Sequence, residues 1–208
     1  MKKTILSLIV ALGATIMASA QVLELPSPYK TGGKTILESL WNRESGTEFS
    51  EEQLSPEEIS NLLFAAIGVN RDNGKLTSPT ASNKQEIRVF VFIKEGVGEY
   101  LNKENAISVI AEGDYRGLIA GRQDWVKSAP LCLLIVADGN KFGSTNESSM
   151  TMMAVDAGIV SQNISLYCAG KGLVTRPRAS MDTEGLKKLL SLDENQFPIM
   201  NAPIGYKK

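Results

Sequence analysis

The feature that most constrains the fold is one long segment, from Ser149 to Gly170, whose apolar residues recur at helical spacing. These residues fall on more than one side of the predicted helix, so a fully solvated position would leave apolar surface in water. A helix of this kind lies either in the centre of a domain or in a subunit interface. The apolar residues that define it are Met152, Val155, Ile159, Ile164, Leu166 and Ala169.

Shorter segments on either side of this helix show helix and strand patterns. Ser55-Pro56-Glu57-Glu58 is typical of a helix start, because serine caps the first turn, proline suits its first position and glutamate reaches back to the cap. That helix is expected to end near Gly68. Further helices are predicted over 35–41, 106–111, 116–126 and 182–190, and strands over 87–93, 129–137 and 199–206.

Residues 172–175 are expected to end the long helix, and residues 71–75 to form a loop. Mixed helices and strands of this order predict an α+β fold, with one layer of sheet flanked by helices. Residues 21–208 are enough for one domain with a substantial core.

Composition excludes several kinds of chemistry. The chain has no histidine, which removes Ser-His-Asp hydrolysis, Cys-His proteolysis and histidine-ligated metal sites, and we expect no metal. A formal charge of −1 gives no general attraction to nucleic acid. Cys132 and Cys168 both sit in apolar runs, so buried unpaired thiols are favoured over a disulfide, although their pairing stays open.

The N-terminus has the pattern of a secretory signal peptide. Lys2 and Lys3 precede an apolar run of about fourteen residues, shorter than the span of about twenty that crosses a membrane. The run ends in Ala18-Ser19-Ala20, a small-x-small cleavage pattern. We therefore expect residues 1–20 to be removed near Ala20 and the protein to be exported to the periplasm, without a membrane span.

Two polar segments flank the predicted helix that begins at Ser55. Arg43-Glu44-Ser45 offers a guanidinium and a hydroxyl, and this pair suits a phosphate. Ser78-Pro79-Thr80-Ala81-Ser82-Asn83-Lys84-Gln85 is a loop rich in amides and hydroxyls. Asn83 and Gln85 each offer a donor and an acceptor, as the mixed edge of a flavin or nucleobase requires.

This combination resembles the nitroreductase family, flavin enzymes with an Arg-x-Ser before such a helix and a Pro-Ser-x-x-Asn-x-Gln loop after it. Three further segments are similar to that family, so the resemblance covers nearly all of residues 21–208. Gln123 lies shortly before a strand, at a position that the resemblance places near the flavin pyrimidine. Residues 156–166 look like the family's central helix, and 202–206 like its terminal Pro-x-Gly strand.

The resemblance implies an antiparallel-rich sheet flanked by helices, a homodimer and bound FMN. It places the backbone N–H groups of Pro177-Arg178-Ala179-Ser180 near flavin N5, so no side chain need be catalytic. One phosphate cluster and no Gly-x-Gly-x-x-Gly fingerprint favour FMN over FAD. The implied cofactor-binding residues are Arg43, Glu44, Ser45, Thr47, Ser78, Pro79, Thr80, Ala81, Asn83, Gln85, Gln123, Pro177, Arg178, Ala179 and Ser180.

The chain departs from the family pattern in two places. Thr47 stands where many members repeat a basic residue, and the chain stops at Lys207-Lys208, where longer members place a cationic pair for the phosphate. A frayed, solvated tail is favoured for these lysines. Arg176 or Arg178 is the alternative cation for the phosphate, although a surface role suits either of them equally well.

The resemblance implies an FMN-dependent oxidoreductase acting on a small electron-poor molecule, with the loop 79–85 reaching the flavin of the partner chain. A non-catalytic flavin-binding or flavin-carrier protein is the alternative, and a structural or adhesion role is the least favoured. Export would place the protein where nicotinamide cofactors are scarce, so we expect slow reduction by NADH or NADPH. The sequence names neither the physiological substrate nor the electron donor.

Overall fold

The computed structural model describes residues 21–208, so the predicted signal peptide, residues 1–20, lies outside the described residues. Seven strands form one sheet in the order β1-β4-β3-β2-β5-β7-β6, and every neighbouring pair is antiparallel. The strands are β1 (Val22–Glu24), β2 (Ile87–Ile93), β3 (Gly96–Leu101), β4 (Ala106–Glu112), β5 (Leu131–Asp138), β6 (Leu173–Thr175) and β7 (Gln196–Tyr206).

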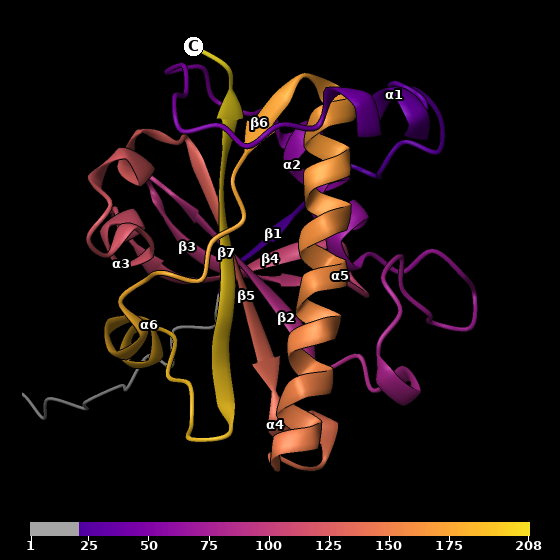
Figure 1. Ribbon diagram of the computed structural model, residues 1–208, viewed down its shortest axis with the longest axis vertical. Coiled ribbons are helices and arrows are strands. Elements are labelled where there is room, and N and C mark those ends of the chain that lie inside the picture. Colours follow the sequence, from indigo (N-terminus) through magenta and orange to yellow (C-terminus); the bar gives the residue numbers. More distant parts are fainter. Residues whose placement is uncertain (1–20) are drawn as a thin grey trace, which may run out of the picture.

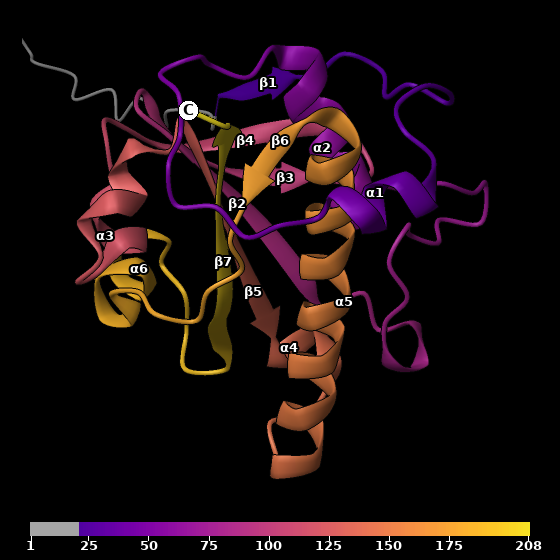
Figure 2. The same cartoon turned by 45° about the horizontal axis from the view of Figure 1, so that its top comes forward.

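Helices cover both faces of this sheet (Figures 1 and 2). On one face α5 runs the length of the molecule and packs against α2, β5 and β7, while α3 and α6 pack on the other face. The helices are α1 (Ile36–Asn42), α2 (Pro56–Ile67), α3 (Arg116–Ala120), α4 (Gly139–Phe142), α5 (Glu147–Lys171) and α6 (Thr183–Leu189), with short 3-10 turns η1 (Ala81–Asn83) and η2 (Asp124–Ser128). The predicted α+β architecture with a helix-flanked antiparallel sheet is confirmed.

The central strand β5 is apolar throughout because both of its faces are buried. Leu131, Leu133 and Ile135 point into the core beneath α2 and α5, while Leu134 and Val136 point into the core beneath α3 and α6. Each of these side chains is at most 1% exposed. A strand buried on both faces reads as a continuous apolar run, which is the pattern by which the sequence predicted it.

The two cysteines lie on opposite faces of the sheet and are free. Cys132 projects from β5 into the core with α3, and Cys168 projects from α5 into the other core. Burial raises the pKa of Cys132 to about 12, so both position and chemistry keep this thiol out of exchange reactions. The favoured interpretation of two unpaired buried thiols is confirmed.

The prediction of a helix over 106–111 was wrong, because these residues form β4. Ile107 and Val109 are β-branched and pair with β1 and β3 on either side, so sheet pairing decides this segment. Strand β3 before it was not predicted, since Gly96 and Gly98 obscure its alternation. A Cβ at Gly98 would lie 2.9 Å from the Ser108 carbonyl, so glycine is required there by the close approach of β4.

The helix predicted over 116–126 is divided into α3 and η2 by Gly121, which has a φ of 56°. Gly172 ends α5 in a left-handed conformation, as expected, but residues 173–175 then form the edge strand β6. Strand β7 begins at Gln196, three residues before the predicted tail. None of the helices within residues 21–208 is long and apolar enough to span a bilayer.

Candidate functional site

The Arg43–Ser45 segment follows α1 and lies beside the edge strand β6. Ser45 forms a parallel bridge with Thr175, and the Gly46 N–H donates to the Thr175 carbonyl at 3.2 Å. The side chains of Arg43 and Ser45 are exposed. The bridge therefore sets the predicted phosphate-binding residues next to the start of the 176–180 segment, in which the family resemblance places Pro177–Ser180 near the flavin ring.

The C-terminal lysines reach the same place. Phe49 bridges to Lys207, and the Lys207 Nζ donates to the Glu44 carboxylate at 2.6 Å. The hydrogen bond and charge of Lys207 lower the pKa of Glu44. The bridge to Phe49 thus continues β7 to Lys207, beside the Arg43–Ser45 segment. The Lys207 amine forms an ion pair with Glu44 there.

Arg178 is a buried side chain that anchors the 176–180 segment. Its guanidinium donates to the Asn201 Oδ1 at 2.8 Å, the Ile119 carbonyl at 3.1 Å, the Ala120 carbonyl at 3.2 Å and the Gln123 Oε1 at 3.2 Å. Burial lowers the pKa of Arg178, and none of the described carboxylates forms an ion pair with it. The geometry gives Arg178 a structural role, which leaves Arg176 as the exposed cation of this pair.

The residues after Arg178 present free backbone donors. Arg178 exchanges two backbone hydrogen bonds with Asn201 at 2.8 and 2.7 Å, and the Asn201 amide donates to the Ser180 carbonyl at 3.1 Å. Within the described residues, the N–H groups of Ala179 and Ser180 have no acceptor, and both residues are exposed. The segment is thus fixed by its carbonyl groups and by Arg178, while its N–H groups remain available to a ligand.

The Ser78–Gln85 loop folds onto itself and onto α5. The Gln85 N–H donates to Thr80 Oγ1 at 2.8 Å, and the Gln85 side-chain amide donates to the Gly74 carbonyl at 2.9 Å. The Ala81 N–H donates to the Asp156 carboxylate of α5 at 2.8 Å. The Gln85 amide also approaches Asn83 Oδ1 at 3.4 Å, so part of the predicted ring-binding capacity of both amides is used within the loop.

The structure places the fifteen predicted residues in different environments, and two of them are buried: Ser78 and Arg178. The half-buried ones are Thr47, Thr80, Ala81, Gln85 and Pro177, and the exposed ones are Arg43, Glu44, Ser45, Pro79, Asn83, Gln123, Ala179 and Ser180.

Within one chain the two predicted halves of the site are far apart. The loop is attached to α5 at Asp156, whereas the strap before α1 is attached at Gly170, where the Lys34 N–H donates to the Gly170 carbonyl. These two points are about fourteen residues apart on the helix, or about 21 Å along its axis. Figures 1 and 2 agree, since the loop before β2 lies beside the lower half of α5 and α1 beside its upper end.

Three polar side chains around the loop are buried: Ser78, which the sequence predicted as a cofactor-binding residue, and the carboxyls of Glu86 and Asp156, for which sequence reasoning predicted no role. Ser78 and Glu86 stand at the two ends of the loop and are 2% and 0% exposed, and Asp156 is 4% exposed. Neither the Ser78 hydroxyl nor the Glu86 carboxyl has a hydrogen-bond partner among the described residues. No local signal marked Glu86 as buried, because Lys84 and Arg88 lie two positions away on either side and a solvated carboxylate suits such a sequence.

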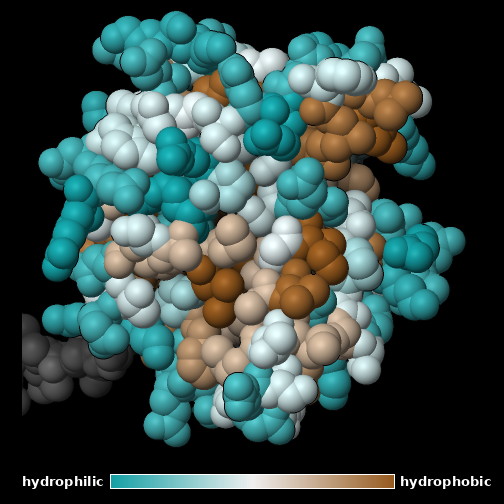
Figure 3. Space-filling view, in the orientation of Figure 1, coloured by the Kyte–Doolittle hydropathy of each residue, from teal (hydrophilic) through white to brown (hydrophobic). Residues whose placement is uncertain are grey.

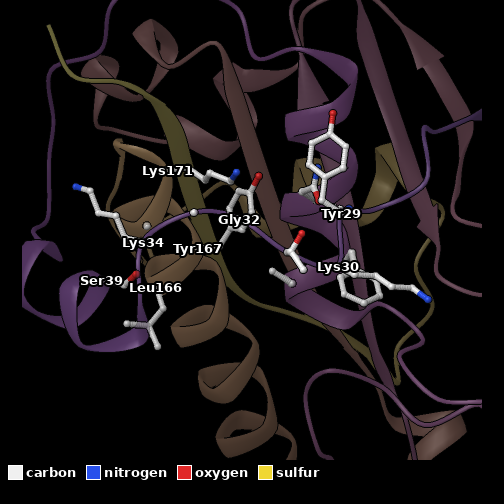
Figure 4. Close-up of a pocket in the computed structure, with 14 residues that line it drawn as sticks. Tyr29, Lys30, Gly32, Lys34, Ser39, Leu166, Tyr167 and Lys171 are labelled. Carbon is white, nitrogen blue, oxygen red and sulfur yellow. Dashed lines mark hydrogen bonds between the residues drawn. The ribbon is translucent and has the colours of Figure 1, made fainter.

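A cavity of about 250 Å³ opens between the segment before α1, helix α2 and the end of α5 (Figure 4). Tyr167 and Lys171 lie close together on its α5 side, and Lys34 lies near Ser39 (Figure 4). Lysine amines at the rim favour an anion. None of the predicted cofactor-binding residues lines this cavity, so it is separate from the candidate flavin site.

Comparisons with known proteins identify the family and the fold. The model of the nitroreductase family matches residues 41–206. A nitroreductase homologue from Methanocaldococcus jannaschii is 26% identical over 178 residues, which cover 81% of this chain and 89% of that protein. A solved nitroreductase homologue from Ralstonia eutropha superimposes with a TM-score of 0.84 at 33% identity, and the match covers 90% of each chain.

A more distant solved structure shares the fold. The NADPH:FMN oxidoreductase of Vibrio harveyi, solved with NAD⁺, superimposes with a TM-score of 0.63 at 19% identity, over 83% of this chain and 69% of that one. The match of the family model over most of the chain establishes the assignment. The chain belongs to the nitroreductase family, whose members are oxidoreductases.

Proposed function

We propose that this protein is an FMN-dependent oxidoreductase that reduces or oxidises a small electron-poor molecule, such as a nitroaromatic or a quinone, at the interface of a homodimer. The observation that carries the proposal is the Ser45–Thr175 bridge, which joins the exposed Arg43 and Ser45 to the segment with the free Ala179 and Ser180 N–H groups. Membership of the nitroreductase family supports the flavin assignment.

The residues present fit FMN. Thr175 and Ala179 are about four residues apart, which limits their separation to about 14 Å, a span suited to a cofactor with a phosphate at one end and a ring at the other. Arg43, Ser45 and Arg176 would hold the phosphate through charge-assisted hydrogen bonds. The Ala179 and Ser180 N–H groups would donate to the N5 edge of the ring, where they favour added negative charge.

FMN, when bound, supplies the two-electron chemistry. The chain's own residues would bind and orient the ring. Arg178 contributes indirectly: its four hydrogen bonds hold the 177–180 backbone so that the Ala179 and Ser180 N–H groups keep their direction. Preorganised donors of this kind cost no reorganisation when charge develops on the ligand.

A second copy of the chain would complete the site. The Ser78–Gln85 loop attaches to α5 at Asp156, about 21 Å along the helix from Gly170, where the strap before α1 attaches, and this separation supports a site built from two chains. The outward face of α5 carries Met152 and Val155, which are 46% and 53% exposed. Figure 3 shows apolar atoms gathered over the middle of α5 and over α1. Burial of this surface against a partner would favour dimerisation.

A flavin carrier without turnover of its own is a second candidate. The sharing of the Lys207 amine with Glu44 and the threonine at position 47 favour it, because both reduce the positive charge available for tight cofactor binding. The two candidates differ in electron flow. A carrier would bind flavin without transferring electrons to added quinone or nitroaromatic faster than free FMN does.

The test begins with the purified protein. We expect visible flavin absorbance, FMN on mass spectrometry of the released cofactor, and re-oxidation of the dithionite-reduced protein by a quinone or nitroaromatic. Recovery of FAD, or of no flavin after incubation with FMN, would contradict the proposal. Anaerobic titration with NADH and NADPH then identifies the donor, and slow reduction by both is expected if the protein is exported.

Export to the periplasm is also a proposal, and it rests on the signal-like pattern of residues 1–20. N-terminal sequencing of the protein from its native host tests it. We expect the mature chain to begin at Gln21, and a chain that retains Met1 in the cytoplasm would contradict export.

A further inference from the structure

The Ser78–Gln85 loop has a backbone that its own residues do not favour. Ser82, Asn83 and Gln85 have φ values of 52°, 55° and 52°. These values lie in the left-handed region, which residues other than glycine rarely adopt. Three such residues within four positions need support from the rest of the fold. Any group that holds this loop therefore affects the conformation that it presents.

Asp156 supplies such a support. It lies on α5, is 4% exposed, and accepts a hydrogen bond from the Ala81 N–H at 2.8 Å. This bond ties the loop to the long helix at the point where the left-handed residues begin. The second oxygen of this buried carboxylate also requires a hydrogen-bond donor, since burial of a charge without hydrogen bonds costs free energy.

Glu86 is the neighbouring group. It follows the loop directly, is 0% exposed, and neither of its oxygens accepts from a donor within the described residues. A neutral carboxyl has an O–H that can donate to a second carboxylate, whereas two ionised carboxylates repel. Burial in the first place, and the adjacent Asp156 in the second, raise the pKa of Glu86 to about 7.

The charged groups around this pair come from three elements. Asp156 of α5 raises the pKa of Glu86, and Lys141 of α4 favours the ionised form of Glu86. Lys84 of the loop extends toward Gly143, after α4. No described cation forms an ion pair with either carboxyl, so a shared proton is the available means of balancing them.

We propose that Glu86 and Asp156 share one proton, and that the protonated pair positions the flavin-binding loop by keeping Asp156 in place to accept the Ala81 N–H. Loss of the proton sets two negative charges against each other and releases the loop from α5. The two carboxyls are positioning residues. Their effect on cofactor binding rests on the proposed function, whereas their effect on the loop conformation is independent of it.

The direction of the pH dependence follows from the linkage of protonation to conformation. The folded pKa of Glu86 lies above its unfolded value of 4.5, so the folded, loop-bound state holds the proton more tightly. The contribution of the pair to stability is therefore complete below about pH 4.5 and is lost as the pH rises through about 7. Loop release belongs to the neutral-to-alkaline side of this range.

Hydrogen exchange measured by mass spectrometry on the flavin-free protein tests the proposal. After correction for the intrinsic pH dependence of exchange, protection of the 78–86 segment should fall by roughly tenfold between about pH 5.5 and about pH 8.5. Glu86→Gln keeps the shape and always donates to Asp156, so its protection should stay high at both values. Glu104→Gln, an exposed carboxyl in the β3–β4 turn, is the control and should behave as the unmodified protein.

Asp156→Asn is the second variant, because its amide can accept from Ala81 and donate to Glu86 at every pH. A flat protection profile in this variant supports the shared proton even where Glu86→Gln does not fold. Protection of the unmodified protein that is equal at both pH values would overturn the proposal. An equal fall in the unmodified protein and in both variants would overturn it as well.

Flavin titration of the same samples separates this inference from the proposed function. A pH-dependent loop in a protein that binds no FMN would leave the shared proton standing and remove the flavin assignment. FMN binding by a protein whose loop protection is the same at both pH values would keep the flavin assignment and remove the shared proton. With both correct, FMN affinity weakens above about pH 7 in the unmodified protein and not in Glu86→Gln.

Discussion

At the residue scale, two arginines only two positions apart do different work. Arg176 is exposed and lies 6.0 Å from the ring of Trp125, while Arg178 is buried and makes four hydrogen bonds beneath the same ring. Sequence analysis offered either arginine as the cation for the phosphate. Their difference arises from the bridge between Arg178 and Asn201, which turns one side chain inward.

Replacement of Arg178 tests this structural role. Lysine carries three donors on a point-like amine and lacks the planar fork that Arg178 uses, so Arg178→Lys leaves buried carbonyls unpaired. We expect the free energy of unfolding to fall by roughly 2–4 kcal/mol. Arg176→Lys is the matched control, with an expected change within about 0.5 kcal/mol. Equal stabilities of the two variants in urea denaturation would argue against an anchoring role for Arg178.

The proposed phosphate contact makes a prediction about Arg43. Arg43→Ala removes an exposed guanidinium that no described carboxylate pairs with, so folding should be unaffected. FMN binding should weaken by roughly 1.5–3 kcal/mol, the value of a hydrogen bond to a charged group. Lys103→Ala, at an exposed turn, controls for loss of positive charge alone. Unchanged FMN affinity, measured by fluorescence titration, would place Arg43 outside the site.

The buried carboxyls mark the limit of residue-level prediction. Glu86 and Asp156 are separated by about a third of the chain, and neither has a local pattern that indicates burial. Their proximity results from the packing of α5 against β2 and the loop, so it depends on tertiary structure and not on local sequence. By contrast, the Arg43–Ser45 and Ala179–Ser180 segments carried recognisable local patterns, and the structure joins Ser45 to Thr175, four residues before Ala179.

At the element scale, prediction succeeded where local chemistry decides the structure. The Ser55 hydroxyl accepts from the Glu58 N–H at 3.2 Å and the Glu58 carboxylate accepts from the Ser55 N–H at 2.8 Å, as the capping-box pattern indicated. The long helix was predicted to within two residues of its start. Prediction failed at β4, whose conformation depends on pairing with β3, which was not predicted, and with β1, which is distant in the sequence.

The capping box of α2 is directly testable. Ser55→Ala removes one half of the reciprocal pair, and we expect a loss of about 1 kcal/mol in the free energy of unfolding, within the usual range of about 0.5–2 kcal/mol. Ser50→Ala, in the preceding loop, is the control, since its hydroxyl accepts only from the Glu52 N–H at 3.3 Å. Thermal and urea denaturation measure both variants. A loss in Ser50→Ala as large as in Ser55→Ala would contradict the capping interpretation.

At the scale of the whole molecule, the long helix α5 carries apolar residues on more than one side. The fold of one chain buries only part of this apolar surface. One side of α5 is buried by α2 and the sheet, but the opposite side remains open, and a Cβ placed on Gly158 would meet nothing within 4 Å. Sequence alone could not separate the core side from the open side, because the whole helix lacks a single polar face.

The homodimer is the prediction that belongs to this scale. Val155→Glu places a charge in the middle of the open face of α5, where burial against a partner would leave it unpaired. We expect the variant to be monomeric at micromolar concentration by light scattering and to lose FMN, since the partner's Ser78–Gln85 loop would no longer reach the cofactor. Val22→Glu is matched to it in exposure, at 50% against 53%, and should remain dimeric and yellow. A dimer mass for Val155→Glu, or a monomer that keeps FMN as tightly as the unmodified protein, would show that flavin binding does not depend on this face of α5.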